Sequence, residues 1–194
     1  LSSARMAVKC GAESVIFHAG YYGDSSPEKA YETIKKGLSE VVSILKSERN
    51  PVVLRPETMG KKSQFGSLEE ILFLCREVKG TLPCIDFSHI HAREGKVNSY
   101  DEFQRVLRKI EKKLGKDAVK NMHIHVSGVE YNKKGEMKHV NLIESDFRFD
   151  EWIQALEDCE VSGMVICESP NLEKDAVMLK NLYQSYLRRK GRKT

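Results

Sequence analysis

The sequence has 194 residues, of which 40% are hydrophobic and 31% charged, and its formal net charge at pH 7 is +4. This composition is ordinary for a globular protein, and the length suits one domain with a sizeable core. No apolar stretch approaches the roughly 20 residues of a membrane span, and no signal peptide opens the chain, so we expect a cytoplasmic protein that does not bind membranes. The five cysteines are scattered and odd in number, which indicates free thiols rather than a disulfide framework.

The first half of the chain predicts two strand-and-helix units. Residues 14–17 form a short apolar run typical of a buried strand, and Ser26 is placed to cap the helix that follows. Residues 51–55 predict the next strand. The helix after it begins with a capping box, in which Ser67 and Glu70 are spaced to satisfy each other's backbone N–H groups.

The second half repeats the pattern. Residues 82–85 predict a third strand, and Ser99 with Glu102 predicts a capping box at the start of the next helix. Strands are also expected at residues 122–126 and 164–167, separated by a longer polar loop that has room for one more strand, and by a helix. A final helix leads to a basic end. We expect a single domain over residues 1–187 and a solvated basic tail over residues 188–194.

Apolar strands that alternate with amphipathic helices predict an α/β protein with a parallel sheet covered by helices. No glycine-rich nucleotide-binding motif follows any strand, which argues against the common open-sheet folds. Metal-binding side chains instead end nearly every strand, and only a barrel brings all strand ends to one mouth. We therefore predict a TIM (β/α)8 barrel. Because the pattern gives five clear strands, we expect the first two or so βα units to be absent from this chain.

The side chains at these strand ends are a candidate metal site. A carboxylate that follows a buried run must be paired or bound to a cation, because burying it bare is costly. One such residue alone means little, but their joint occurrence favours a metal centre. Carboxylates and imidazoles without thiolates suit zinc, manganese or non-haem iron. The strand-end candidates are His18, Glu57, Asp86, His123 and Glu168, and His89 follows Asp86 in an Asp-x-x-His motif.

Two histidines compete for one of these positions. Side chains alternate between the faces of a strand, and on that ground we expect only one of His123 and His125 to point into the barrel. We choose His123.

The order of motifs along the chain resembles the endonuclease IV family of apurinic/apyrimidinic endonucleases, which belongs to the xylose-isomerase-like TIM barrels. The motifs are FHAG, RPETMGKKSQFGS, CIDFSHIHA, MHIHVSG, MKH and ICESP, and the resemblance runs from about residue 5 to residue 185. It implies a hydrolase that cleaves DNA on the 5′ side of abasic sites in base excision repair. It also implies two or three Zn²⁺ ions, with Mn²⁺ as an alternative metal.

The resemblance further implies how the ligands divide. One zinc would take Glu57, Asp86, His123 and Glu168. A second would take His18 and share Glu57, while the family's other histidine ligand to this ion has no counterpart in these residues. A third would take His89 and His139, with an aspartate two residues before the latter. In this sequence that position is Met137, and Glu136 stands next to it.

The implied mechanism is hydrolysis by a metal-activated water, which Glu57 would position as the catalytic residue. The loops after the strands would meet backbone phosphates, giving base-independent and salt-sensitive binding. The loop residues expected to contact DNA are Tyr22, Lys61 and Arg93, although an ordinary solvated surface explains them equally well. The mild positive charge permits such a partner without requiring it. The oligomeric state is not defined by the sequence, and we expect a monomer.

Two other functions stay open. A sugar isomerase or epimerase on the same barrel would use the four ligands of the first zinc around a single metal. His18, His89 and His139 argue against it, because a one-metal enzyme does not need them as ligands. A divergent, non-catalytic DNA-binding barrel is the second alternative, and Met137 is its main support.

Overall fold

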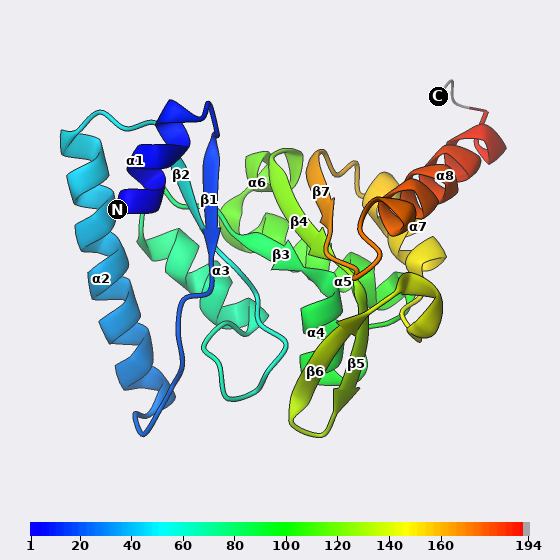
Figure 1. Cartoon of the computed structure of the whole chain (residues 1–194), viewed down its shortest axis with the longest axis horizontal. Helices are drawn as coiled ribbons and strands as arrows, with labels where there is room; N and C mark the ends of the chain where they lie inside the picture. The colour runs from blue at the N-terminus through cyan, green and yellow to red at the C-terminus, as the bar shows by residue number, and fades with distance from the viewer. Residues whose placement is uncertain (192–194) are drawn as a thin grey trace.

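Five parallel strands form the sheet that positions the site (Figure 1). The computed structural model describes residues 1–191, so residues 192–194 of the expected tail lie outside it. The strands run in the order β1-β2-β3-β4-β7, and two bridges, Leu54 to Thr81 and Glu57 to Cys84, join β2 to β3. A closed TIM barrel has eight such strands, so the prediction of a partial barrel is confirmed. The strands are β1 (Ser14–Phe17), β2 (Val53–Pro56), β3 (Cys84–Asp86), β4 (Met122–Val126) and β7 (Gly163–Cys167).

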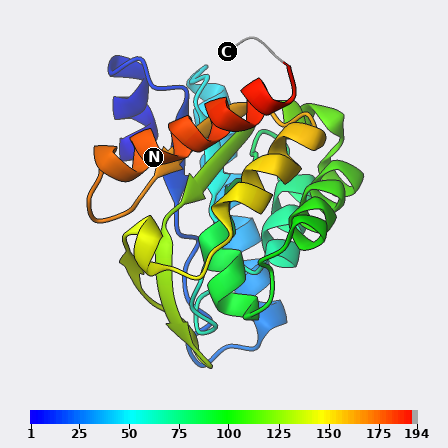
Figure 2. The same ribbon diagram turned by 90° about the vertical axis from the view of Figure 1, so that its right-hand side faces the viewer.

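Helices cover the outer side of this sheet (Figures 1 and 2). The Ser26 side chain accepts a hydrogen bond from the Lys29 amide, and the capping box of Ser67 and Glu70 is complete. Ser99 opens its helix as expected, but its side chain makes no hydrogen bond to the helix backbone. The helices are α1 (Ser2–Lys9), α2 (Pro27–Ser47), α3 (Leu68–Glu77), α4 (Phe87–Glu94), α5 (Tyr100–Leu114), α6 (Lys116–Lys120), α7 (Phe149–Asp158) and α8 (Glu173–Arg189).

Strand residues that point outward make the core. Leu54 belongs to a cluster with residues of α1, α2 and α3, whereas Ile85 and Ile124 belong to a second cluster with α5 and α7. The alternate residues of the same strands therefore point to the opposite, concave side of the sheet. That side carries the polar residues, of which Arg55 in β2 and Glu57 directly after β2 are both buried.

The two outermost strands differ from the central ones in burial. All three residues of β3 are fully buried, whereas Met164 and Val165 of β7 are 55% and 45% exposed. Within residues 1–191, β1 and β7 each pair with one strand of the sheet only. The sheet is thus open along two parallel edges.

A hairpin occupies the stretch where a polar loop is expected. Strands β5 (Gly128–Asn132) and β6 (Gly135–Val140) pair antiparallel, outside the parallel sheet, and a 3-10 turn, η1 (Leu142–Glu144), follows. Figure 1 shows the hairpin at the end of the molecule to which the parallel strands point. The extra strand that the sequence allows is therefore part of a lid-like hairpin and not of the barrel.

The C-terminal helix α8 continues to Arg189, through the expected start of the basic tail at residue 188. The division into a domain and a tail stays a prediction. Among the described residues, every helix is too short or too polar to cross a lipid bilayer.

Candidate metal centre

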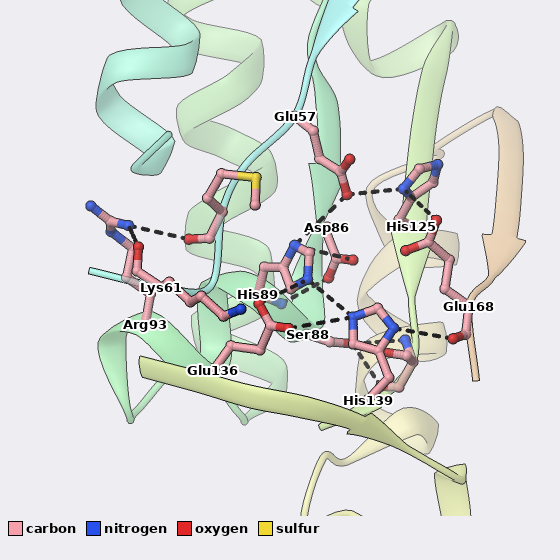
Figure 3. Close-up of polar contacts among 12 residues, drawn as sticks. Glu57, Lys61, Asp86, Ser88, His89, Arg93, His125, Glu136, His139 and Glu168 are labelled. Atoms are coloured by element: carbon pink, nitrogen blue, oxygen red, sulfur yellow. Dashed lines mark hydrogen bonds and ion pairs between the residues drawn. The ribbon is translucent and has the colours of Figure 1, made fainter. Parts of the chain in front are cut away.

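Four acidic and imidazole side chains converge beyond the carboxyl ends of four strands. One potential ligand atom from each lies within 4.8 Å of those of the others. They come from the ends of β2, β3, β4 and β7, so the parallel sheet itself gathers residues that are distant in the chain (Figure 3). We call this set the strand-end cluster; its members are Glu57, Asp86, His125 and Glu168.

Glu57 lies at the middle of the histidines around this cluster and is 3% exposed. Its Oε1 accepts a hydrogen bond of 2.9 Å from Nδ1 of His125, and its Oε2 lies 3.5 Å from Nε2 of His18. Nδ1 of His125 also lies 3.2 Å from Oε1 of Glu168. The two carboxylate oxygens of Glu57 therefore face different histidines, as a bridging ligand requires.

The pKa values of two carboxylates in this cluster, Glu57 and Glu168, are shifted in opposite directions. Burial by itself would raise the pKa of Glu57, but hydrogen bonds from His125 and His18 outweigh it and lower that pKa to about 2. Burial raises the pKa of Glu168, and the charges of Glu57 and Asp86 add to the effect. Glu57 is thus held as an anion, while Glu168 is the carboxylate most in need of a cation.

The strand-end cluster contains His125 in place of the chosen His123, which stays a predicted ligand. Residues two apart in a strand share a face, so His123 and His125 both point to the concave side, with ring centroids 5.3 Å apart. His125 pairs with Asp86 at the strand end, whereas His123 pairs with Cys84, one layer deeper. Burial and the neighbouring His125 lower the pKa of His123 to about 4. Strand alternation thus places both rings on the concave side, and the register of β4 against β3 distinguishes His125 at the mouth from the deeper His123.

Asp86 has a vacant acceptor that fits a cation. It caps α4, and its Oδ1 accepts a 2.7 Å hydrogen bond from the His89 amide. Its Oδ2 is fully buried and accepts no hydrogen bond from any described residue, with Nδ1 of His89 3.5 Å away. A buried carboxylate oxygen without a hydrogen bond is costly, and a metal ion in the strand-end cluster would satisfy it.

A second group of potential ligands lies beside the first. Nε2 of His89 is 3.2 Å from Nε2 of His139 and 3.4 Å from Oε2 of Glu136. We call these three residues the hairpin cluster, because Glu136 and His139 belong to β6 (Figure 3). His89 joins the two clusters, since its Nδ1 lies 3.7 Å from Oε1 of Glu57.

The hydrogen bonds of the two rings orient their Nε2 atoms in a way that suits a cation between them. Nδ1 of His89 bonds the Thr58 carbonyl at 3.0 Å, and Nδ1 of His139 bonds the Glu168 carbonyl at 3.1 Å. A carbonyl oxygen only accepts, so both Nδ1 atoms carry the proton, and in neutral rings both Nε2 atoms present lone pairs to each other. Two such lone pairs at close range repel, and either a bound metal ion or a second proton on one ring relieves the repulsion. Burial opposes that proton on His89, but the nearby carboxylates of Asp86 and Glu136 raise the pKa of His89 overall. Fixing the tautomer through Nδ1 is also how proteins orient metal-binding histidines.

A β-bulge explains how Glu136 reaches this cluster. The register shifts between Glu130 and Tyr131, which pair with Lys138 and Glu136 respectively, so Met137 is an extra residue without a partner. Without the bulge, residues 136 and 139 would lie on opposite faces of the strand. The bulge returns Glu136 to the face of His139 and leaves Met137 51% exposed. Met137 is therefore turned away from the hairpin cluster, and the adjacent Glu136 is the residue placed beside His89 and His139.

Two glycines allow the hairpin to reach the loop after β2. A Cβ on Gly60 would lie 2.6 Å from Cβ of Glu136, and one on Gly135 would lie 2.2 Å from the Gly60 carbonyl oxygen. Gly135 also has a φ of +100°, a backbone conformation that residues other than glycine rarely adopt. The close approach permits a 3.1 Å hydrogen bond from the Glu136 amide to the Gly60 carbonyl. The position of the Glu136 carboxylate thus depends on two residues that lack a side chain.

Tyr22 and Arg93 are half-buried and bonded within the protein, and their contacts with DNA stay a prediction. The Arg93 guanidinium donates to the carbonyl oxygens of Met59, Lys61 and Gln64, and to the Tyr22 hydroxyl at 3.2 Å. The Tyr22 hydroxyl in turn donates to Glu70 at 2.7 Å. Both residues hold the loop after β2 in place. The Lys61 side chain, in contrast, is exposed.

Fold and site together define a parallel α/β barrel with imidazole and carboxylate ligands at the strand ends. The model of the family described as "Xylose isomerase-like TIM barrel" matches residues 1–185. The chain belongs to this family.

The relatives of this chain include one protein without an assigned activity and several probable endonucleases. The chain is 47% identical over 184 residues to "Uncharacterized protein MJ0133" of Methanocaldococcus jannaschii, covering 94% of this chain and 67% of that protein. It is 31% identical over 139 residues to "Probable endonuclease 4" of Geobacillus sp. (strain WCH70), covering 68% of this chain and 44% of that protein. The chain therefore spans less than half the length of this endonuclease relative.

Solved structures show the same fold with two chemistries. Endonuclease IV from Thermus thermophilus has a TM-score of 0.64 at 19% identity, over 94% of this chain and 64% of that one. The 3-keto-D-glucoside 4-epimerase YcjR from E. coli also has a TM-score of 0.64, at 13% identity, over 92% of this chain and 67% of that one. These likenesses concern the fold, and they do not separate the two activities.

Proposed function

We propose that this protein is a metal-dependent phosphodiester hydrolase of the endonuclease IV type, which cleaves DNA 5′ to abasic sites. The observation that carries the proposal is the pair of adjacent ligand clusters, linked by His89. A single metal does not need the hairpin cluster, whereas several cations side by side suit the displacement of an oxygen at phosphorus. Zn²⁺ is the expected metal, and Mn²⁺ is the alternative that the same ligands allow. When bound, such ions activate water and stabilise the departing oxygen.

The residues of the chain divide into holding and positioning roles. His18, Asp86, His125 and Glu168 would hold cations around Glu57, and His89, Glu136 and His139 would hold one beside them. Glu57 is the proposed catalytic residue. Its two oxygens face different histidines, and hydrogen bonds keep it ionised, so it can accept a hydrogen bond from the attacking water and fix that water in line with phosphorus.

A single-metal sugar isomerase or epimerase is the second candidate. The strand-end cluster alone supplies four ligands, and the epimerase structure matches the fold as well as the endonuclease structure does. In that reaction two carboxylates would move a proton beside a bound ketose. The hairpin cluster favours the hydrolase, because in the one-metal enzyme these three residues would have no metal ion to bind.

Metal content and DNA incision test the choice. We expect the purified protein to hold at least two zinc equivalents by elemental analysis and to nick a duplex with one abasic site, but not the intact duplex. One metal equivalent, no nicking and interconversion of ketoses would favour the isomerase. Full metal content with DNA binding but no incision would instead favour a non-catalytic DNA-binding barrel.

A further inference from the structure

Two pairs of lysines from distant parts of the chain lie together beside the hairpin cluster. Lys61 and Lys62 belong to the loop after β2, and Lys133 and Lys134 form the turn of the β5–β6 hairpin. The Lys62 amide donates to the Lys134 carbonyl at 3.1 Å, and Lys61 forms an antiparallel bridge with Gly135. We call these four residues the four-lysine surface.

The backbone beneath these lysines is fixed. On the hairpin side, the Lys134 amide donates to the Asn132 side chain at 2.7 Å, which closes the turn. On the loop side, Arg93 donates to the Lys61 carbonyl at 2.5 Å and to two further carbonyls of the loop. The ammonium groups are therefore carried on a preformed platform rather than on a free loop.

The charges of the four-lysine surface are not neutralised by the protein. All four side chains are exposed, and among residues 1–191 none has a carboxylate within 4.0 Å. Lys138, farther along β6, differs, because it forms a 3.0 Å ion pair with Glu130. Four uncompensated ammonium groups repel one another, and a polyanion relieves that repulsion while losing condensed counterions.

The surface lies directly beside the candidate metal centre. Gly60, which precedes Lys61, lies against both Glu136 and the His89 ring. Figure 3 shows Lys61 beside Arg93, on the side of the hairpin cluster that carries Glu136. A polyanionic chain bound to the lysines would therefore extend to the mouth of the barrel.

We propose that the four-lysine surface binds the sugar–phosphate backbone of DNA next to the bond that is cut. This inference rests on the proposed function, and it assigns the backbone contact to a surface built by two segments instead of to Tyr22 and Arg93. Ammonium groups on flexible stems bind phosphates as point charges, so the contact is independent of base sequence. Arg93 becomes a positioning residue that holds the loop.

Charge removal tests the surface. One variant replaces all four lysines with glutamine, and a matched control replaces four exposed lysines at the opposite end of the strands, Lys9, Lys46, Lys112 and Lys116. Both variants lose four charges. Binding of a fluorescent 30-base-pair duplex with an abasic-site analogue is followed by anisotropy between 50 and 300 mM salt. Circular dichroism and zinc content establish that both variants are folded.

We expect the four-lysine variant to bind at least about tenfold more weakly at 150 mM salt, with the slope of log K against log salt reduced by about 3 to 4. The control should change affinity less than about twofold. Arginine at the same four positions should restore the slope, because arginine keeps the charge. Equal losses in variant and control, or an unchanged slope, would overturn the proposal.

The unmodified protein separates this inference from the proposed function. If the four-lysine variant alone loses duplex binding while the unmodified protein nicks no abasic duplex, the surface stands and the hydrolase proposal fails. If the unmodified protein nicks the duplex and the variant binds like the control, the hydrolase stands and the surface is rejected.

Discussion

The strand-end cluster and the hairpin cluster use the same ligand chemistry but are built in different ways. The first takes its residues from four parallel strands, whose register places Asp86 beside His125. The second takes His89 from the first turn of α4 and the rest from a hairpin outside the sheet. The backbone ladder thus fixes the first cluster, whereas the second requires the hairpin to pack on the loop through Gly60.

Because the two clusters are built by different elements, they should fail independently. Damage at the strand ends removes the central ligands and the proposed catalytic carboxylate. Damage at the hairpin should remove one cation and leave the strand-end ligands in place. The following variants test that separation, beginning with the largest expected effect.

Glu57→Gln should lower the rate of abasic-site incision by at least about a thousandfold, because it removes the anionic oxygens that face both His18 and His125. The fold should persist, since glutamine has the same shape. Single-turnover kinetics on an abasic duplex measure the loss. Glu40→Gln, at an exposed position of α2, is the matched control and should be active. Turnover retained by Glu57→Gln would show that the catalytic role belongs to another residue.

His125→Ala and His123→Ala form a matched pair on one strand. His125→Ala should remove metal from the strand-end cluster and reduce incision on the order of a hundredfold, whereas His123→Ala should change it only a few-fold. The two rings lie at different depths in the barrel. His125 contacts Glu57 and Glu168 at the strand end, whereas His123 lies deeper, opposite Cys84. Zinc content per chain and incision rate are measured together. The reverse order of effects would restore His123 as the ligand.

Glu136→Gln should cost about one zinc equivalent and reduce incision roughly tenfold to a hundredfold, with the strand-end metal retained. Met137→Ala should leave both quantities close to those of the unmodified protein, because Met137 is the bulged, exposed residue. Elemental analysis after dialysis distinguishes the two variants. Equal zinc content in both would mean that Glu136 is not a ligand.

Gly60→Ala should destabilise the protein by about 1–3 kcal/mol, because its methyl group would overlap Glu136. Gly37→Ala should do the opposite and stabilise it by about 0.5–1 kcal/mol, since Gly37 lies within α2 with nothing within 4 Å of an added Cβ. Urea unfolding gives both values. A neutral Gly60→Ala would indicate that the hairpin can move away from the loop.

Much of the fold follows from local sequence. The strands 14–17 and 122–126 have the predicted bounds. The first is a short, mostly apolar run before His18, and in the second apolar residues alternate with two histidines before Ser127. Glu57, Asp86 and Glu168 could be placed at one mouth, because parallel strands that alternate with helices bring their carboxyl ends together.

The remaining site residues needed more than local pattern. The sequence allows the inward orientation of His125 to be predicted, because residues two apart in a strand share a face, whereas the expectation above places His123 and His125 on opposite faces. The position of Glu136 could not be predicted in this way, because a bulge depends on the pairing of two strands, and linear spacing points to Met137. The inward role of Arg93 and Tyr22 depends on contacts with residues about 30 to 70 positions away, which no local pattern contains.

The open edges of the sheet act as a directional template. Within residues 1–191, the outer edges of β1 and β7 pair with no further strand, and every pair inside the sheet is parallel. Any strand that adds there in parallel must also finish at the mouth. Its last side chain would then point toward the strand-end cluster, as those of His18 and Glu168 do.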